Sequence, residues 1–386
     1  MNPAWTSEKL FFSADAYFED LLGAVAQART SVRFESYIFA DGRLATRVRT
    51  ILMDAARRGV DVRLLVDGFG SPFWGGGDAE VLSATGVRCQ VYWPAPWALW
   101  QWSFAEDYAR SWWGPLRWLF RAFVHMNRRD HRKLCVVDDH AAWLGSMNVS
   151  DQHLSRLAGG DGWRDTGVRV EGPPVATLGA LFDRCWDERK TPPPADFRRL
   201  KGPRSWALAV VRSNETRRRR RGFARDLVWR IGATRGRVWI TNAYFVPALS
   251  LLRALQRAAK GGADVRVLLP EKSDIPMMGW VASSFYALLL KSGVRLFEYR
   301  AGVLHAKSVL LDRWAMVGSS NLNQRSLRHD LELDVALHKP ASIDTLAARY
   351  LIDLERSHEI DPKTWEGSSR LRRALGWLFL ALRSVL

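Results

Sequence analysis

The sequence predicts an α/β fold built from two similar halves, and three observations support this prediction. The chain has 386 residues, enough for two domains that each bury a core of their own. Segments of the first 150 residues have counterparts between residues 237 and 321. In both halves, short apolar stretches alternate with amphipathic helical patterns. That order is typical of βαβ units and of a largely parallel sheet covered by helices on both faces.

The internal repeat defines the elements expected in each half. Four pairs of segments correspond: 31–39 with 237–245, 55–67 with 258–270, 85–93 with 292–300, and 131–148 with 305–321. The order expected from them is strand, helix, strand, helix, strand, followed by a further pair of strands. Two α/β lobes with one site at their junction are the simplest architecture for such a chain.

The domain boundaries follow from the repeat and from local composition. We expect four parts: a first lobe at 1–195, a basic linker region at 196–222, a second lobe at 223–365, and a C-terminal amphipathic helix at 366–386. The linker is indicated by prolines and by the arginine run 217–221. Before its motif, the first half carries 33 more residues than the second, within a Trp-rich insertion at about 94–130. This insertion fits a helix packed over the core and a lipid-facing lid equally well.

Charge and aromatic content narrow the function classes. The formal net charge of +17 favours polyanionic partners, either nucleic acid or an anionic membrane. The 19 tryptophans favour the membrane, because tryptophan prefers its interface. Three widely spaced cysteines indicate neither a disulfide framework nor zinc binding. Without a secretory signal or an apolar run of ~20 residues, we expect a cytoplasmic protein, soluble or peripheral on a membrane.

Two copies of a short motif contain residues that can act on a phosphate group. Histidine and lysine two residues apart project to the same side of an extended strand. An aspartate follows seven residues after the histidine in both copies, and a Gly-Ser-x-Asn sequence begins 14 residues after the histidine in the first copy and 13 in the second. The members are His131, Lys133, Asp138, Ser146 and Asn148 in the first half, and His305, Lys307, Asp312, Ser319 and Asn321 in the second. One His-x-Lys pair arises easily by chance, but two such sets at equivalent places of a repeat predict a functional site.

These residue types predict phosphodiester exchange. Ammonium, hydroxyl and amide groups suit the non-bridging oxygens of a phosphate. A neutral histidine can attack phosphorus, and a second, protonated histidine can donate to the leaving oxygen. The sequence has no carboxylate cluster suited to Mg²⁺ and no His/Cys cluster suited to Zn²⁺, so we expect neither a metal nor another cofactor. Which histidine is the nucleophile stays open at this level.

A histidine in such a role usually needs a carboxylate that fixes its tautomer. Glu332 lies 27 residues beyond His305 and is the candidate partner in the second half. Asp165 is the candidate partner of His131 in the first half. Ordinary charges at strand ends are the alternative interpretation of both acids.

At these residues the sequence resembles the phospholipase D superfamily, and more narrowly the bacterial cardiolipin synthases, over nearly its whole length. The similar segments include ESYIFADG, RDHRKLCVVDD, GSMNVSD, WRDTGVRVEGP, ITNAYFVP and GSSNLNQRSLRHDLE. The resemblance implies a duplicated phospholipase D-like α/β/α sandwich with one active site between its lobes. It also implies transfer of a phosphatidyl group to the hydroxyl of phosphatidylglycerol, with His131 as nucleophile and His305 as acid and base.

The sequence departs from that family in two places. We find no counterpart of the two N-terminal membrane-spanning helices of one common type, so we expect the chain to resemble the shorter relatives, and this leaves donor and acceptor lipids open. Phosphatidylethanolamine is a further possible substrate. Met147 also stands where many first motifs have a small residue.

Two other functions of the superfamily remain open. A phospholipase D hydrolase differs only in using water as acceptor. A nuclease would bind phosphate backbones through the basic residues, but family nucleases are single repeats that dimerise, so nucleic acid is the less favoured partner.

The sequence carries no signal for the oligomeric state. The leucines and arginines at 371–383 predict a helix lying in the plane of the inner membrane, with packing on the core as the alternative.

Overall fold

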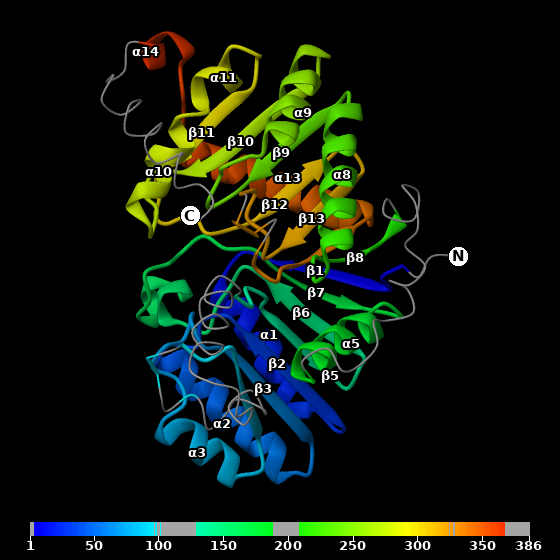
Figure 1. Cartoon of the computed structure of the whole chain (residues 1–386), viewed down its shortest axis with the longest axis vertical. Helices are drawn as coiled ribbons and strands as arrows, with labels where there is room; N and C mark the ends of the chain where they lie inside the picture. Colours follow the sequence, from blue (N-terminus) through cyan, green and yellow to red (C-terminus); the bar gives the residue numbers. More distant parts are fainter. Residues whose placement is uncertain are drawn as a thin grey trace, which may run out of the picture. The chain divides into compact units, whose positions relative to one another are not determined.

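The computed structural model describes residues 4–95, 97–98, 101, 129–187, 208–323, 325–326 and 329–366. The chain forms two compact units (Figure 1). The first comprises Met1–Asp161, Gly167–Lys201 and His329–Leu333. The second comprises Gly162–Thr166, Gly202–Arg328 and Asp334–Leu386. Each unit therefore includes a five-residue segment from the other half of the chain.

The first unit contains a seven-stranded sheet in the order β1-β7-β6-β5-β2-β3-β4. Its strands are β1 (Ser7–Phe11), β2 (Ser31–Ser36), β3 (Asp61–Asp67), β4 (Arg88–Tyr92), β5 (Leu134–Val137), β6 (Ala141–Gly145) and β7 (Gly167–Glu171). Of the strands that the structure describes in this sheet, only β2, β3 and β4 pair in parallel. The expectation of a largely parallel sheet is wrong for this half, because short turns such as the one between β5 and β6 can join only antiparallel neighbours.

Helices cover both faces of this sheet. They are α1 (Ala14–Gln27), α2 (Arg43–Arg57), α3 (Gly77–Ala84) and α5 (Val175–Trp186), with 3₁₀ turns at Asp151–His153 and Arg156–Ala158. Apolar residues of α1, α2 and α3 share one core with alternate residues of the strands, among them Val32 and Phe34. Arg33 points to the other face, where its side chain donates to Asp183 of α5 at 2.9 Å.

The second unit repeats this plan in an eight-stranded sheet, ordered β15-β11-β10-β9-β12-β13-β14-β8. The strands are β8 (Val211–Ser213), β9 (Arg237–Thr241), β10 (Asp264–Pro270), β11 (Arg295–Tyr299), β12 (Ser308–Leu311), β13 (Trp314–Gly318), β14 (Leu333–Leu337) and β15 (Ser357–Glu359). Among the described strands of this sheet, again only β9, β10 and β11 pair in parallel. The second sheet is therefore mixed as well, for the same reason.

The helices of the second unit also lie on both faces of their sheet. They are α8 (Arg217–Ala233), α9 (Leu249–Lys260), α10 (Pro276–Ser283), α11 (Tyr286–Leu290), α13 (Pro340–Glu355) and α14 (Pro362–Glu366). Apolar residues of α8 to α11 form one core with β9, β10 and β11. On the other face, Tyr350 of α13 stacks on Trp239 with the ring centroids 5.1 Å apart. The predicted duplicated α/β/α sandwich is thus confirmed.

The expected linker at 196–222 differs from the structure where it is described. Val211–Ser213 form an edge strand of the second sheet, and Arg217 opens helix α8. The Thr216 side chain caps this helix by accepting from the Arg219 amide at 3.2 Å. An arginine run suits a helix as well as a linker, because arginine has a high helix propensity. Composition alone therefore misplaced this boundary.

Three other expectations lie largely or wholly outside the described residues: the remainder of the linker, most of the Trp-rich insertion, and the C-terminal helix beyond Glu366. Within the described ranges, no helix combines the length and apolar character needed to cross a bilayer.

Candidate active site

The sheet topology fixes where each motif histidine lies. Strand β5 runs antiparallel to β2, with Leu134 opposite Glu35. Residues just before β5 therefore lie beside those just after β2, at the carboxyl end of the parallel strands, where α/β proteins place their sites. The second unit has the same arrangement, with Ser308 of β12 opposite Thr241 of β9. His131 and His305 both occupy this edge of their own sheet.

Each histidine is held by a short segment from the other half of the chain. In the first unit, the His131 amide donates to the Leu331 carbonyl at 3.0 Å, and the Leu331 amide donates to the Arg129 carbonyl at 2.8 Å. In the second unit, the His305 amide donates to the Arg164 carbonyl at 2.9 Å. These contacts account for the exchanged segments 329–333 and 162–166.

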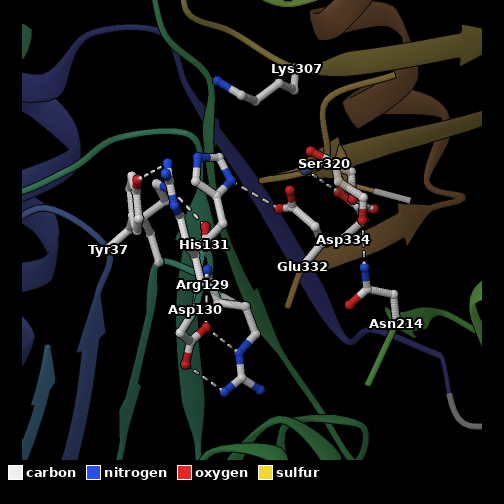
Figure 2. A network of polar contacts seen from close by, with 12 residues as sticks. Tyr37, Arg129, Asp130, His131, Asn214, Lys307, Ser320, Glu332 and Asp334 are labelled. Carbon is white, nitrogen blue, oxygen red and sulfur yellow. Dashed lines mark hydrogen bonds and ion pairs between the residues drawn. The ribbon is translucent and has the colours of Figure 1, made fainter. Parts of the chain in front are cut away.

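The exchanged segments bring a carboxylate to each imidazole. His131 Nδ1 lies 3.1 Å from Glu332 Oε2, and His305 Nδ1 lies 3.0 Å from Asp165 Oδ1 (Figure 2 draws the first pair). Both acids are only 1% exposed. The expected pairing of Glu332 with His305 and of Asp165 with His131 is therefore wrong. The structure crosses the two pairs, because each acid belongs to a segment that joins the other unit.

The side chain of each motif lysine bonds the backbone of the segment that precedes its strand. Lys133 Nζ donates to the His131 carbonyl at 2.6 Å, and Lys307 Nζ donates to the His305 carbonyl at 2.6 Å. Both lysines are buried. These bonds hold each ammonium group at the backbone of its own motif histidine.

Aromatic side chains that the motif does not contain flank the histidines. The Tyr37 ring meets the His131 ring edge-on at 4.7 Å between centroids. In the second unit, the centroids of Trp163 and Tyr244 lie 5.6 and 6.2 Å from that of His305. Tyr37 directly follows β2, and Tyr244 lies three residues after β9, so the repeat does not align the two tyrosines and offered no clear signal for them.

The serine and asparagine of each motif are buried just beyond β6 and β13: Ser146, Asn148, Ser319 and Asn321. Asn148 Oδ1 accepts from the Ile38 amide at 3.4 Å. In the described part of the chain, Asn321 Oδ1 is buried without a hydrogen-bond partner. The Asn321 side chain thus has hydrogen-bonding capacity that a substrate could use.

Asp138 and Asp312 lie at the far end of their strands from the histidines. Asp138 Oδ1 accepts from the amides of Thr30 and Ser31 at 2.8 and 2.9 Å. Burial acts to raise the pKa of Asp138, but these backbone donors outweigh it and lower the pKa below its ordinary value. Asp312 Oδ1 likewise accepts from the Arg237 amide at 2.8 Å. Both aspartates fasten the turn after the motif strand to the start of the neighbouring strand.

A buried ionic cluster lies behind the first motif. Arg132 is fully buried and bonds both Asp130 and Glu35. Although burial acts to raise the pKa of Asp130, the Arg132 guanidinium lowers it below its ordinary value. The spacing of Glu35, Asp130 and Cys185 could suit a metal ion. The Arg132 guanidinium already supplies the positive charge there, so this set does not fit a metal site.

The crossed pairing predicts which substitutions are energetically coupled. In double-mutant cycles followed by chemical unfolding, Glu332→Gln with His131→Ala should show a coupling of about 0.5–3 kcal/mol, because the residues are in contact. Asp165→Asn with His305→Ala should behave alike. Each acid should couple more weakly to the opposite histidine, and Glu19→Gln, at an exposed position of α1, serves as the uncoupled control. Stronger coupling of Glu332 to His305 than to His131 would contradict the pairing.

Comparisons with known proteins identify the family of the chain. The family model described as cardiolipin synthase, PLD-like domain, matches residues 21–186 and 227–353. Cardiolipin synthase B of Salmonella typhimurium is 33% identical over 348 residues, which cover 88% of this chain and 78% of that protein. Cardiolipin synthase A of Pectobacterium atrosepticum is 29% identical over 386 residues, covering 96% and 74% respectively.

Solved structures support the fold. The phosphatidylserine synthase of Haemophilus influenzae superposes with a TM-score of 0.70 at 11% identity, covering 100% of this chain and 97% of that one. A polyphosphate kinase from Porphyromonas gingivalis superposes with a TM-score of 0.61 at 13% identity, covering 98% and 54%. The duplicated motif and the long matches to curated relatives lead to one assignment: the chain belongs to the cardiolipin synthase family with a phospholipase D-like domain.

Proposed function

We propose that this protein is a phosphatidyltransferase that makes cardiolipin, using phosphatidylglycerol as donor and acceptor. The observation that carries the proposal is the pair of buried carboxylates at the Nδ1 atoms of His131 and His305, in a chain of this family. An Nδ1–H that donates to a carboxylate leaves the lone pair on Nε2. Each imidazole is thereby set to use Nε2, either for attack or for proton transfer.

The first half-reaction forms a covalent intermediate. Nε2 of His131 attacks the phosphorus of the donor lipid, and the bond from phosphorus to the oxygen of the headgroup glycerol breaks. His305, protonated at Nε2, gives its proton to that oxygen, so that glycerol leaves. Glu332 stabilises the positive charge that develops on His131. The product is a phosphatidyl group on His131 and a neutral His305.

The second half-reaction reverses these roles. Neutral His305 takes the proton of the acceptor hydroxyl, whose oxygen attacks phosphorus and displaces His131. Lys133, Lys307 and the motif serines and asparagines bind the non-bridging oxygens throughout. Double displacement needs a nucleophile and a proton donor at one phosphorus, and the duplicated motif provides two imidazoles for it. None of these steps uses a metal ion. Asp138 and Asp312 act structurally, through the backbone contacts described above.

The function can be tested by product analysis. Incubated with phosphatidylglycerol, with or without phosphatidylethanolamine, the protein should form cardiolipin in the presence of a chelator. His131→Ala and His305→Ala should each lower turnover by at least about 10²–10⁴-fold while the circular dichroism spectrum stays unchanged. His358→Ala, at an exposed position of β15, is the matched control.

Other products would identify a different function of the superfamily. Phosphatidic acid without cardiolipin would identify a hydrolase. Cleavage of nucleic acid, with no lipid product, would identify a nuclease. Full turnover by His305→Ala would contradict the two-histidine scheme.

The protein is further proposed to bind the inner membrane from the cytoplasmic side as a peripheral protein. The support is a basic face on two adjacent helices. Arginines 218, 221 and 225 of α8 are exposed at helical spacing together with Trp229, which is 65% exposed. On α9, Leu249 is 61% exposed, and arginines 253 and 257 and Lys260 are exposed as well. The acid of these helices, Asp226, is buried against Arg212. This face suits anionic headgroups, with Trp229 at the interface.

Vesicle flotation tests this surface. Arg221→Gln with Arg225→Gln should weaken binding to phosphatidylglycerol vesicles by roughly 2 kcal/mol, or about thirty-fold, because each arginine near such a surface contributes about 1 kcal/mol. Arg47→Gln with Arg156→Gln removes the same charge from exposed positions of the first unit. Equal weakening by both pairs would show that net charge alone matters, and would exclude a dedicated face on α8 and α9.

A further inference from the structure

We call the surroundings of His131 the first half-site and those of His305 the second half-site. The two half-sites differ at one position that the repeat aligns. Arg129 lies two residues before His131, and Val303 lies two residues before His305. Their backbones are held alike. The Arg129 carbonyl accepts from the Leu331 amide at 2.8 Å, and the Val303 carbonyl accepts from the Arg164 amide at 2.8 Å. The backbone therefore does not require an arginine here, so its side chain needs another explanation.

The Arg129 guanidinium lies beside the first half-site. Its Nη1 donates to the Tyr37 hydroxyl at 3.2 Å, and its central carbon lies 4.5 Å from the Phe69 ring centroid. The Tyr37 ring contacts His131, and its centroid lies 4.8 Å from Lys133 Nζ. Figure 2 shows Arg129 and Tyr37 on one side of the His131 ring and Glu332 on the other. Tyr37 thus connects Arg129 to the reacting residues.

The charge of Arg129 is not neutralised by its hydrogen-bonded partner. Burial raises the pKa of Tyr37 to about 12, so this phenol stays neutral at physiological pH. Asp67 attracts Arg129 electrostatically. The Asp67 oxygens, however, accept from the amides of Gly70 and Asp130, each at 2.7 Å. A half-buried guanidinium beside a neutral phenol suits an anionic ligand.

We propose that Arg129, supported by Tyr37, binds the non-reacting phosphate of the acceptor lipid. This inference rests on the proposed function. Lys133 and Lys307 already serve the reacting phosphate, whereas an acceptor phosphatidylglycerol brings a second phosphodiester that water and free glycerol lack. A guanidinium fork suits a phosphate through two parallel hydrogen bonds. Holding that group positions the acceptor hydroxyl and favours lipid over water.

Acceptor competition tests the subsite. With phosphatidylglycerol as donor, the assay follows cardiolipin, phosphatidic acid and the incorporation of deuterated glycerol into phosphatidylglycerol. For Arg129→Gln, cardiolipin formation should fall much further than glycerol exchange. The ratio of the two should drop about ten- to a hundred-fold, the value of one charge-assisted hydrogen bond. Arg129→Lys should shift the ratio in the same direction by less, and Arg47→Gln should leave it unchanged.

The outcomes separate this inference from the function on which it rests. Equal losses of cardiolipin formation and glycerol exchange in Arg129→Gln, or an unchanged ratio, would overturn the subsite. If Arg129→Gln does not fold, an unaltered ratio in Arg129→Lys would overturn it instead. A wild-type protein that forms neither cardiolipin nor exchanged phosphatidylglycerol would overturn the function itself.

Discussion

The bond between each motif histidine and a carboxylate from the other half of the chain is the constraint on which the rest of the site depends. Glu332 and Asp165 are almost completely buried, and a buried carboxylate without a partner is costly. The imidazole provides that partner, and the carboxylate in turn fixes which imidazole nitrogen faces the substrate. Neither half of the duplicated chain completes its own histidine. This explains why the segments 162–166 and 329–333 are exchanged between the two units.

The surroundings of the first half-site hold this geometry rigidly. Arg132 stands between His131 and Lys133 in sequence, and successive residues of an extended strand point to opposite sides. Its guanidinium is fixed by Asp130 and Glu35 in the interior. Breaking such a buried ion pair by removing one partner is strongly destabilising. The cluster therefore anchors in the interior the residue that separates His131 from Lys133.

Much of the fold and of the site followed from periodicity and repetition. The alternation of apolar segments predicted both α/β/α units, and the two-residue spacing placed Lys133 beside His131. The crossed acids could not be predicted, because sequence distance does not reveal that Glu332 pairs within the first unit. Local composition misled at Arg217–Arg221, where a helix cap decides the structure. Tyr37 and Arg129 were missed because their importance comes from contacts across the sheet edge, which a motif does not encode.

In the proposed mechanism, Nε2 of His131 carries the phosphatidyl group between donor and acceptor. To test this, the protein is mixed rapidly with phosphatidylglycerol and quenched in cold denaturant at mildly alkaline pH, which preserves both phosphorus–nitrogen bonds and acyl esters. The adduct is then located by proteolysis and mass spectrometry. We expect a phosphatidyl adduct on the peptide containing His131, lost on brief acid treatment. An adduct on His305 would reverse the assigned roles. An acid-stable adduct on a serine, or turnover without any adduct, would show that His131 is not the nucleophile.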